Sequence, residues 1–224
     1  NAVSEGADSS LCTPYWCRTA MLSPLVIGFD SIGDAAHALT DMQRSWAPYQ
    51  YRFFRRASLI QEKLPYVNLK ERTFPARIPA SPIGLYTLIG EHEMLASEAT
   101  TSLLPAGAIR FTENHEDPPS RAYLKLYEAL TLMGLFFGCD LPGKGERCFD
   151  AGASPGGWTW VLAGLGCNVF SVDRAELVPE LMKNPRVDFL RHDAFTLKPE
   201  DVGICDWVFS DVICYPERLY EWIG

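Results

Sequence analysis

The chain has 224 residues, of which 47% are hydrophobic and 21% are charged. This composition is that of an ordinary globular protein, and the length fits one large domain or two small ones. No run of about 18 uncharged apolar residues occurs, which argues against a membrane-spanning helix, and residues 1–10 lack the apolar segment of a signal peptide. The seven cysteines form no C-x-x-C pair and no Cys/His cluster with zinc-ligand spacing. We therefore expect reduced thiols, no metal and a cytoplasmic protein, because Cys12 and Cys17, the one pair worth weighing as metal ligands, have no further ligands nearby.

The net charge of −8 taken alone argues against a nucleic-acid partner. The charge is uneven, however, because residues 44–77 hold eight basic and two acidic side chains, a local charge of +6 that leaves −14 for the remainder. Four aromatic residues stand in the same window: Tyr49, Tyr51, Phe53 and Phe54. Clustered cations bind phosphates and aromatic rings stack on bases, so we expect an RNA-facing surface that includes Arg52, Arg55 and Arg56. An equally good alternative is a basic face that balances the acidic remainder, with the aromatic rings filling a core.

Residues 1–115 are expected to form a small α/β accessory domain. Asp30 or Ser31 can cap a helix that runs to Met42. Prolines recur between residues 48 and 82, so long helices are not expected there. Three apolar segments are expected to be strands: 24–29, 84–89 and 108–112.

A polar stretch with two prolines, residues 113–119, predicts a domain boundary, after which residues 116–224 form the second domain. Ser120 can cap a helix over residues 121–137. Strands and helices then alternate, with strands at 147–151, 168–172, 187–190 and 204–210 and helices at 156–165 and 176–183. This alternation predicts a parallel sheet with right-handed crossovers, the Rossmann-type α/β fold.

A glycine-rich turn, DAGASPGGWTW from Asp150, lies between the first expected strand and helix of this domain. Glycines let the backbone approach a ligand closely, and the helix start offers free N–H groups to a carboxylate. The turn is not G-x-G-x-x-G, and a large residue follows it, which disfavours a dinucleotide. The candidate cofactor-binding residues here are Gly152, Ser154, Gly156, Gly157 and Trp158.

Acidic residues follow three of the expected strands, where ligands of parallel sheets bind. Asp173, 21 residues after Gly152, can accept hydrogen bonds from both ribose hydroxyls of an adenosine; the alternative is an exposed loop residue. Asp193 can accept from an adenine amine or, equally well, cap a turn. Asp211 points at the expected reaction space, and no Asn-Pro-Pro-Tyr motif of amine-directed methyltransferases stands there.

Lys125 lies between two leucines on the helix that precedes the first strand. A lysine in such a place is usually a surface residue whose stem covers apolar neighbours. The motifs taken together nevertheless resemble the FtsJ-type ribose 2′-O-methyltransferases, closest to the branch that acts on large-subunit ribosomal RNA. The segments that carry the resemblance are SRAYLKL from Ser120, DAGASPGGW from Asp150, SVD ending at Asp173, RHDAF from Arg191 and SDV from Ser210.

The resemblance covers residues 118–217 and implies S-adenosylmethionine as cofactor and RNA, ribosomal RNA above all, as partner. It implies a Lys–Asp–Lys–Glu catalytic set in which Lys125 matches the first lysine and Asp211 the aspartate. By the same match, four residues would contact the cofactor: Gly156, Trp158, Asp173 and Asp193. In the family the second lysine is the usual candidate base, and Lys125 would position and tune it.

The second lysine and the glutamate of that set belong to later strands, beyond Gly224. We therefore expect the sequence to be part of a longer protein. Three other functions remain open: a small-molecule methyltransferase, which would not need Lys125, a nicotinamide-dependent dehydrogenase, which would share only the glycine turn and Asp173, and a non-catalytic RNA-binding protein of the same fold.

Overall fold

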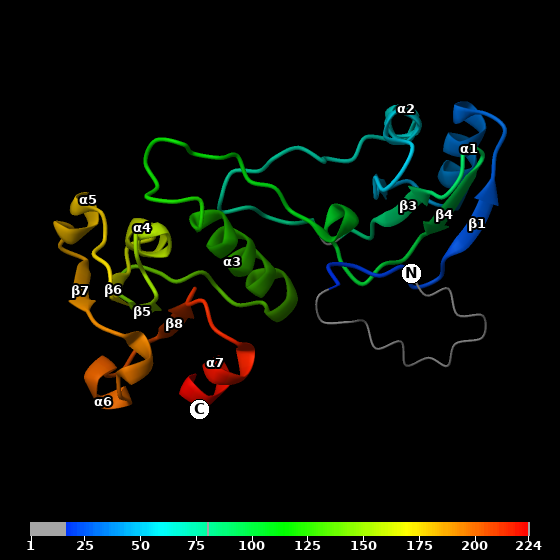
Figure 1. Cartoon of the computed structure of the whole chain (residues 1–224). Coiled ribbons are helices and arrows are strands. Elements are labelled where there is room, and N and C mark those ends of the chain that lie inside the picture. The colour runs from blue at the N-terminus through cyan, green and yellow to red at the C-terminus, as the bar shows by residue number, and fades with distance from the viewer. Residues whose placement is uncertain (1–16, 80, 224) are drawn as a thin grey trace. The chain divides into compact units, whose positions relative to one another are not determined.

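The computed structural model describes residues 17–79 and 81–223, so Cys12 lies outside the described part of the chain. The chain divides into two compact units, one that ends at Arg110 and one that begins at Phe111 (Figure 1). Each unit holds its own four-stranded sheet and its own buried apolar residues.

The first unit is a mixed sheet with the strand order β1-β4-β3-β2. Strand β4 runs antiparallel to β1 and β3, while β2 runs parallel to β3. The Ser31 hydroxyl accepts from the Asp34 N–H at 3.1 Å and so caps α1. The elements are β1 (Leu25–Gly28), α1 (Ile32–Met42), β2 (Trp46–Pro48), α2 (Phe54–Lys63), β3 (Gly84–Leu88), β4 (Glu93–Ser97) and the 3-10 turn η1 (Pro105–Gly107).

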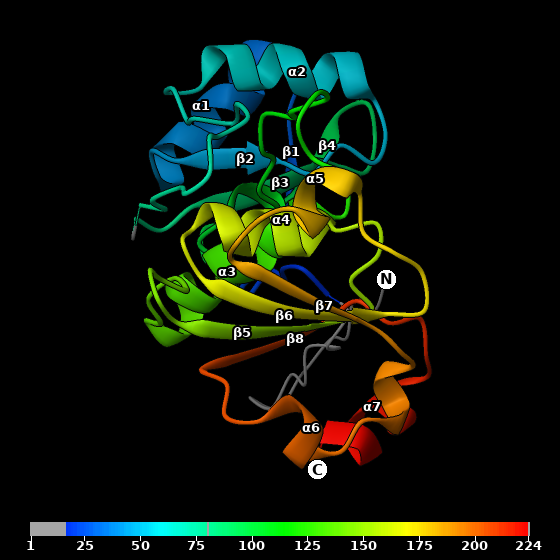
Figure 2. The same cartoon turned by 90° about the vertical axis from the view of Figure 1, so that its left-hand side faces the viewer.

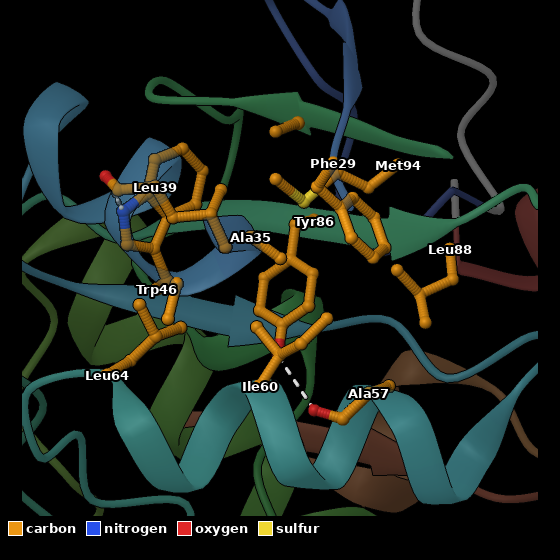
Figure 3. Packing of buried hydrophobic residues seen from close by; sticks show 12 residues of the cluster. Phe29, Ala35, Leu39, Trp46, Ala57, Ile60, Leu64, Tyr86, Leu88 and Met94 are labelled. Carbon is orange, nitrogen blue, oxygen red and sulfur yellow. Dashed lines mark hydrogen bonds between the residues drawn. The ribbon is translucent and has the colours of Figure 1, made fainter. Parts of the chain in front are cut away.

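Both helices of the first unit pack against the sheet over one shared core (Figure 3). Trp46 and Tyr86 are fully buried there, and each satisfies its polar atom. The Trp46 indole N–H donates to the Leu39 carbonyl at 2.8 Å, and the Tyr86 hydroxyl donates to the Ala57 carbonyl at 3.1 Å. Burying such rings with their hydrogen bonds made gives apolar stabilisation without the cost of an unpaired donor.

Helix α2, ten residues long, forms inside the proline-containing stretch, where only long helices were not expected, because Pro48 and Pro65 flank it and neither lies in its interior. One expectation for this unit was wrong. Residues 108–112 form no strand: Ala106 and Gly107, both at positive φ, turn the chain, and only a single bridge position follows at Phe111. Strands β2 and β4 were not predicted.

The second unit is a parallel sheet with the order β7-β6-β5-β8, which confirms the predicted Rossmann-type α/β fold. Helices α4 and α5 lie on one face and α6 and α7 on the other (Figure 2). The elements are α3 (Tyr123–Phe137), β5 (Arg147–Ala151), α4 (Gly157–Gly164), β6 (Asn168–Asp173), α5 (Pro179–Met182), β7 (Val187–Arg191), η2 (Ala194–Thr196), α6 (Pro199–Val202), β8 (Trp207–Ser210) and α7 (Pro216–Ile223).

The second unit also departs from the sequence expectations in detail. The helix expected at 176–183 shrinks to α5, because Pro179 lacks an N–H and fits only a first turn. Strand β8 starts at Trp207 rather than at residue 204, and Ser120 precedes a turn rather than capping α3. Helices α6 and α7 were not predicted.

Within residues 17–79 and 81–223, none of the helices has both the length and the hydropathy that crossing a bilayer requires. The same residues contain no group of three or more His, Cys, Asp and Glu side chains arranged to hold a metal ion.

Candidate active site

The glycine turn after β5 packs closely against the segment that follows β8. Gly152 has φ 79°, and a Cβ there would lie 2.6 Å from Val212 Cγ1 and 3.1 Å from the Val212 backbone nitrogen. The Gly152 N–H donates to the Val172 carbonyl at 2.9 Å, at the end of β6. Glycine is therefore required here by the protein's own backbone, and the turn brings the ends of three strands together.

The start of α4 is packed onto the start of α3. A Cβ on Gly157 would lie 2.6 Å from Ser120 Oγ and 3.3 Å from the Tyr123 backbone nitrogen. The Trp158 indole N–H donates to the Ala122 carbonyl at 2.9 Å. The polar atom of Trp158, a residue expected to contact the cofactor, is thus engaged by α3, the helix that carries Lys125. This contact was not predicted, because nothing in the sequence pattern places α3 beside α4.

At Gly156 the glycine turn passes close to α5. It has φ 117°, and a Cβ there would lie 2.3 Å from Leu181 Cδ1. Both the conformation and the close approach require glycine.

Asp173, at the end of β6, is tied directly to the glycine turn. Its Oδ2 accepts from the Ser154 N–H at 3.0 Å, and its Oδ1 accepts from the Ala175 N–H at 2.9 Å. The side chain is half-buried. A carboxylate oxygen has two lone pairs, so each oxygen can still accept one further hydrogen bond.

Asp193 caps η2, accepting from the Phe195 N–H at 3.1 Å, and pairs with the Arg174 guanidinium. The hydrogen bond from Arg174 is the main reason that the pKa of Asp193 lies below its usual range. Asp193 therefore caps a turn in the structure, as the second of its two interpretations predicted. Arg174, which directly follows Asp173, had no signal in the sequence beyond its position at the end of a strand.

Lys125 and Asp211 are in direct contact. The Lys125 Nζ lies 3.0 Å from each carboxylate oxygen of Asp211, so the two residues that the resemblance matches to the catalytic set meet in the structure. Strand β8, which Asp211 follows, pairs with β5 in parallel, and α3 carries the lysine to the same end of the sheet. The side chain of Lys125 is 64% exposed and that of Asp211 33%, so a ligand can reach the pair from solvent.

Asp150, on β5, is a buried carboxyl group that sequence analysis passed over. The Thr159 hydroxyl donates to its Oδ2 at 2.7 Å and lies 2.8 Å from the Ser171 hydroxyl. Its Oδ1 has no hydrogen-bond partner among the described residues. Burial raises the pKa of Asp150 to about 7, the hydrogen bonds from Thr159 oppose this shift, and the charges of Asp211 and Asp173 add to it.

We expect the stability of the fold to depend on the ionisation of Asp150. The unfolded side chain ionises at about pH 4, whereas the folded one keeps its proton up to about pH 7, so stability falls as the pH rises through this window. Asp150→Asn keeps the acceptor for Thr159 and removes the charge. Relative to the parent, its free energy of unfolding should rise on the order of a few kcal/mol between about pH 4 and about pH 8.

Urea unfolding of both proteins at the two pH values measures this difference. Asp188→Asn, an exposed change on β7, is the matched control and should leave the pH dependence of the parent unchanged. A constant difference between Asp150→Asn and the parent across the window would show that Asp150 ionises normally in the fold.

The basic and aromatic window of the first unit is largely at the surface. Arg52 and Arg55 are exposed, while Arg56 is half-buried, with its guanidinium carbon 5.9 Å from the centre of the Phe29 ring. Four aromatic side chains are exposed: Tyr49 (56%), Tyr51 (62%), Phe53 (36%) and Phe54 (57%). These rings therefore do not fill the core, which rules out that part of the alternative interpretation.

Comparison with known proteins identifies the second unit. Residues 118–217 match the FtsJ-like methyltransferase family. The second unit is an FtsJ-like methyltransferase domain. The resemblance found from the motifs is therefore confirmed, and the glycine turn and the Lys125–Asp211 pair both lie within the matched residues.

Relatives of the chain bear the name ribosomal RNA large subunit methyltransferase M. The protein of Hahella chejuensis is 36% identical over 140 residues, which cover 61% of this chain and 35% of the relative. The protein of Halorhodospira halophila is 41% identical over 101 residues, covering 45% and 29%. The protein of Xanthomonas campestris pv. campestris is 34% identical over 191 residues, covering 84% and 51%. The chain thus spans about a third to a half of the length of these relatives.

A solved structure from Streptococcus thermophilus that bears the name hemolysin is 26% identical to this chain. The superposed part covers 49% of this chain and 40% of the Streptococcus thermophilus chain, with a TM-score of 0.39. This likeness is too low to bear on the fold or the function.

Proposed function

We propose that the protein transfers a methyl group from S-adenosylmethionine to a ribose 2′-hydroxyl of RNA, ribosomal RNA above all. The contact between Lys125 and Asp211 carries this proposal. A small-molecule methyltransferase has no need of a lysine on α3, whereas here the lysine meets an aspartate at the carboxyl end of the sheet, beside the glycine turn. The names of the relatives support ribosomal RNA as the substrate class.

The residues around the glycine turn fit S-adenosylmethionine. The Asp173 carboxylate keeps acceptor capacity for two ribose hydroxyls after its two backbone hydrogen bonds are counted. The start of α4, where no side-chain hydrogen bond caps the helix at Gly156, suits the carboxylate of the methionine moiety. Asp193 can receive an adenine amine with its remaining lone pairs, while Arg174 and η2 hold it in place.

The side chains of the site have distinct roles in the proposed reaction. Bound S-adenosylmethionine supplies a methyl group made electrophilic by the sulfonium. Asp211 holds the Lys125 ammonium through both oxygens, and this fixed positive charge can orient the 2′-hydroxyl and stabilise the negative charge that develops on its oxygen. The hydroxyl proton would pass to the second lysine of the catalytic set that the resemblance implies. Trp158 fixes the start of α3 and thereby the place from which Lys125 reaches. Alignment of oxygen, methyl and sulfur contributes much of the remaining acceleration.

Replacing Asp173 with alanine should weaken the binding of S-adenosylhomocysteine by roughly 1.5–3 kcal/mol, the scale of hydrogen bonds to a charged group. Isothermal titration calorimetry of the parent and the variant measures this loss. Asp188→Ala, an exposed aspartate on the neighbouring strand β7, is the matched control and should bind as the parent does.

The same titration tests the proposed cofactor itself. The parent should bind S-adenosylhomocysteine more tightly than NAD. Tighter binding of NAD would contradict the proposal, and a loss below about 0.5 kcal/mol in the Asp173→Ala protein would mean that Asp173 does not bind the cofactor.

A further inference from the structure

An arginine of α7 contacts the turn that follows β7. The guanidinium carbon of Arg218 lies 4.2 Å from the centre of the Phe195 ring, within the range of a cation–π contact. Phe195 belongs to η2, the short turn between β7 and α6. Arg218 is exposed and Phe195 is half-buried, so this contact lies at the surface of the second unit, where a ligand can reach it.

A second residue of α7 packs on the same ring. Trp222 follows Arg218 by one helical turn, so the two side chains share a face of α7. The Trp222 and Phe195 rings meet nearly edge-on, with centroids 5.6 Å apart and planes at 70°. Trp222 also lies 6.1 Å from the Phe149 ring of β5, and the Arg218 N–H donates to the Tyr215 carbonyl at 3.1 Å. Phe195 is therefore held from α7 by a cation and a ring whose own positions the fold sets.

The same turn carries the carboxylate proposed to receive the adenine amine. Asp193 accepts from the Phe195 N–H at 3.1 Å, so the ring and the carboxylate belong to one hydrogen-bonded turn. The hydrogen bond from Arg174 is the main cause that lowers the pKa of Asp193, and the positive charge of Arg218 acts in the same direction. Arg218 therefore acts on both groups of the turn, the aromatic ring and the carboxylate.

The segment after β8 joins this turn to the Lys125–Asp211 pair. Asp211 directly follows β8, and Arg218 stands further along the same segment, in the first turn of α7. One stretch of chain thus contacts both the proposed place of methyl transfer and the turn proposed to bind adenine. A substitution of Arg218 can be assigned to the adenine end only if its effect depends on Phe195.

We infer that Arg218 is a positioning residue for the cofactor: it lies over the Phe195 ring and fixes this ring as a wall of the adenine site beside Asp193. Adenine is a flat aromatic group, and a ring next to the carboxylate that accepts its amine gives it a surface on which to pack. A ring that is already held costs less entropy to immobilise when the ligand binds. The inference rests on the proposed cofactor, whereas the contact between α7 and η2 does not.

Isothermal titration calorimetry of the full-length protein with S-adenosylhomocysteine tests whether Arg218 acts on the cofactor site. Arg218→Gln removes the cation and should weaken binding about 2- to 5-fold, the scale of an exposed cation–π contact. Arg218→Lys keeps a cation without the planar guanidinium, so its affinity should lie between those of the parent and Arg218→Gln. Lys183→Gln, which removes one positive charge from an exposed position of the same unit, is the matched control and should bind as the parent does.

A double-mutant cycle tests whether Arg218 acts through Phe195. Phe195→Leu removes the ring and keeps an apolar side chain. In that background Arg218→Gln should leave the affinity nearly unchanged, because the cation no longer has a ring to hold. A loss of the same size in both backgrounds would overturn the inference, since Arg218 would then act on Asp193 by its charge or support α7 as a whole.

Adenosine, which has the base and the ribose but no methionine moiety, locates the effect within the cofactor. Arg218→Gln should weaken the binding of adenosine and of S-adenosylhomocysteine by the same factor, because the lost contact concerns the base. A loss seen with S-adenosylhomocysteine alone would contradict the inference and would place the effect at the methionine end. This comparison needs only the Arg218 variants, so it decides the matter even if Phe195→Leu does not fold.

The outcomes separate the role of Arg218 from the proposed function. If the parent binds S-adenosylhomocysteine and Arg218→Gln binds it equally well, the role of Arg218 is overturned and the proposed cofactor stands. If the parent binds neither S-adenosylhomocysteine nor adenosine, both are overturned.

Discussion

Methyl transfer to RNA by the full-length protein is expected to fall by about 100-fold or more when Lys125 is replaced with alanine. The affinity for S-adenosylmethionine should remain nearly unchanged, because the Nζ contacts Asp211 and not the glycine turn. Single-turnover transfer at saturating cofactor measures the first quantity and calorimetry the second. A loss in transfer without a loss in cofactor binding is the result that separates a group acting on the hydroxyl from a group that holds the cofactor.

The conservative variant and a distant lysine sharpen this experiment. Lys125→Arg keeps the positive charge opposite Asp211 but changes its geometry, so transfer should be intermediate between the parent and Lys125→Ala. Lys183→Ala removes an exposed lysine at the end of α5 and should transfer as the parent does. Full activity of Lys125→Ala would refute a role for this lysine in the reaction.

Gly152→Ala is expected to destabilise the protein by about 2–5 kcal/mol. One part of the cost is the left-handed conformation, roughly 1–2 kcal/mol for an L-residue, and the other is the contact with Val212, since overpacking costs roughly 1–3 kcal/mol. The clash involves the Val212 backbone nitrogen, 3.1 Å away, as well as its side chain. Any relief must shift the segment that carries Asp211, so cofactor binding and the Lys125 contact should suffer with stability.

Two other glycines separate the contributions. Gly138 has φ 65° and nothing within 4 Å of its ideal Cβ, so Gly138→Ala should cost only the left-handed part, about 1–2 kcal/mol. Gly164 lies at the end of α4 in open space without a positive φ, so Gly164→Ala should be neutral or stabilise by up to about 1 kcal/mol. Chemical denaturation of the three variants measures the series. Equal losses for Gly152→Ala and Gly138→Ala would mean that the contact with Val212 has no energetic weight.

Periodicity predicted the parallel sheet well because its strands are apolar runs separated by unmistakable turn residues. The turn from Gly152 to Gly157 marks the end of β5 and the start of α4, and Asp173 marks the end of β6. Helix α2 was missed because prolines near a segment were given the weight of prolines within it. Residues 108–112 were wrongly predicted to be a strand because they have the apolar pattern of one. The turn at Ala106 and Gly107 directs the chain so that only one bridge position forms, at Phe111.

The sequence predicted which residues of the candidate site meet, but not the contacts that hold these residues in place. The meeting of Lys125 and Asp211 follows from adjacent first and fourth strands, a property of the fold class. The bond from Trp158 to the Ala122 carbonyl and the pairing of Arg174 with Asp193 depend on side-chain directions that no spacing encodes. Asp150 was visible in the sequence, but its burial, and therefore its raised pKa, is a property of the sheet around it.

The position of the transferred methyl group tests the proposed reaction most directly. The full-length protein is incubated with tritiated S-adenosylmethionine and an unmodified transcript of large-subunit ribosomal RNA, and the RNA is then hydrolysed in alkali. Alkaline cleavage needs a free 2′-hydroxyl, so a 2′-O-methyl group protects the linkage that follows it. We expect the tritium in alkali-resistant dinucleotides. Tritium in mononucleotides, which would place the methyl group on a base, or no incorporation above the reaction without RNA, would contradict the account.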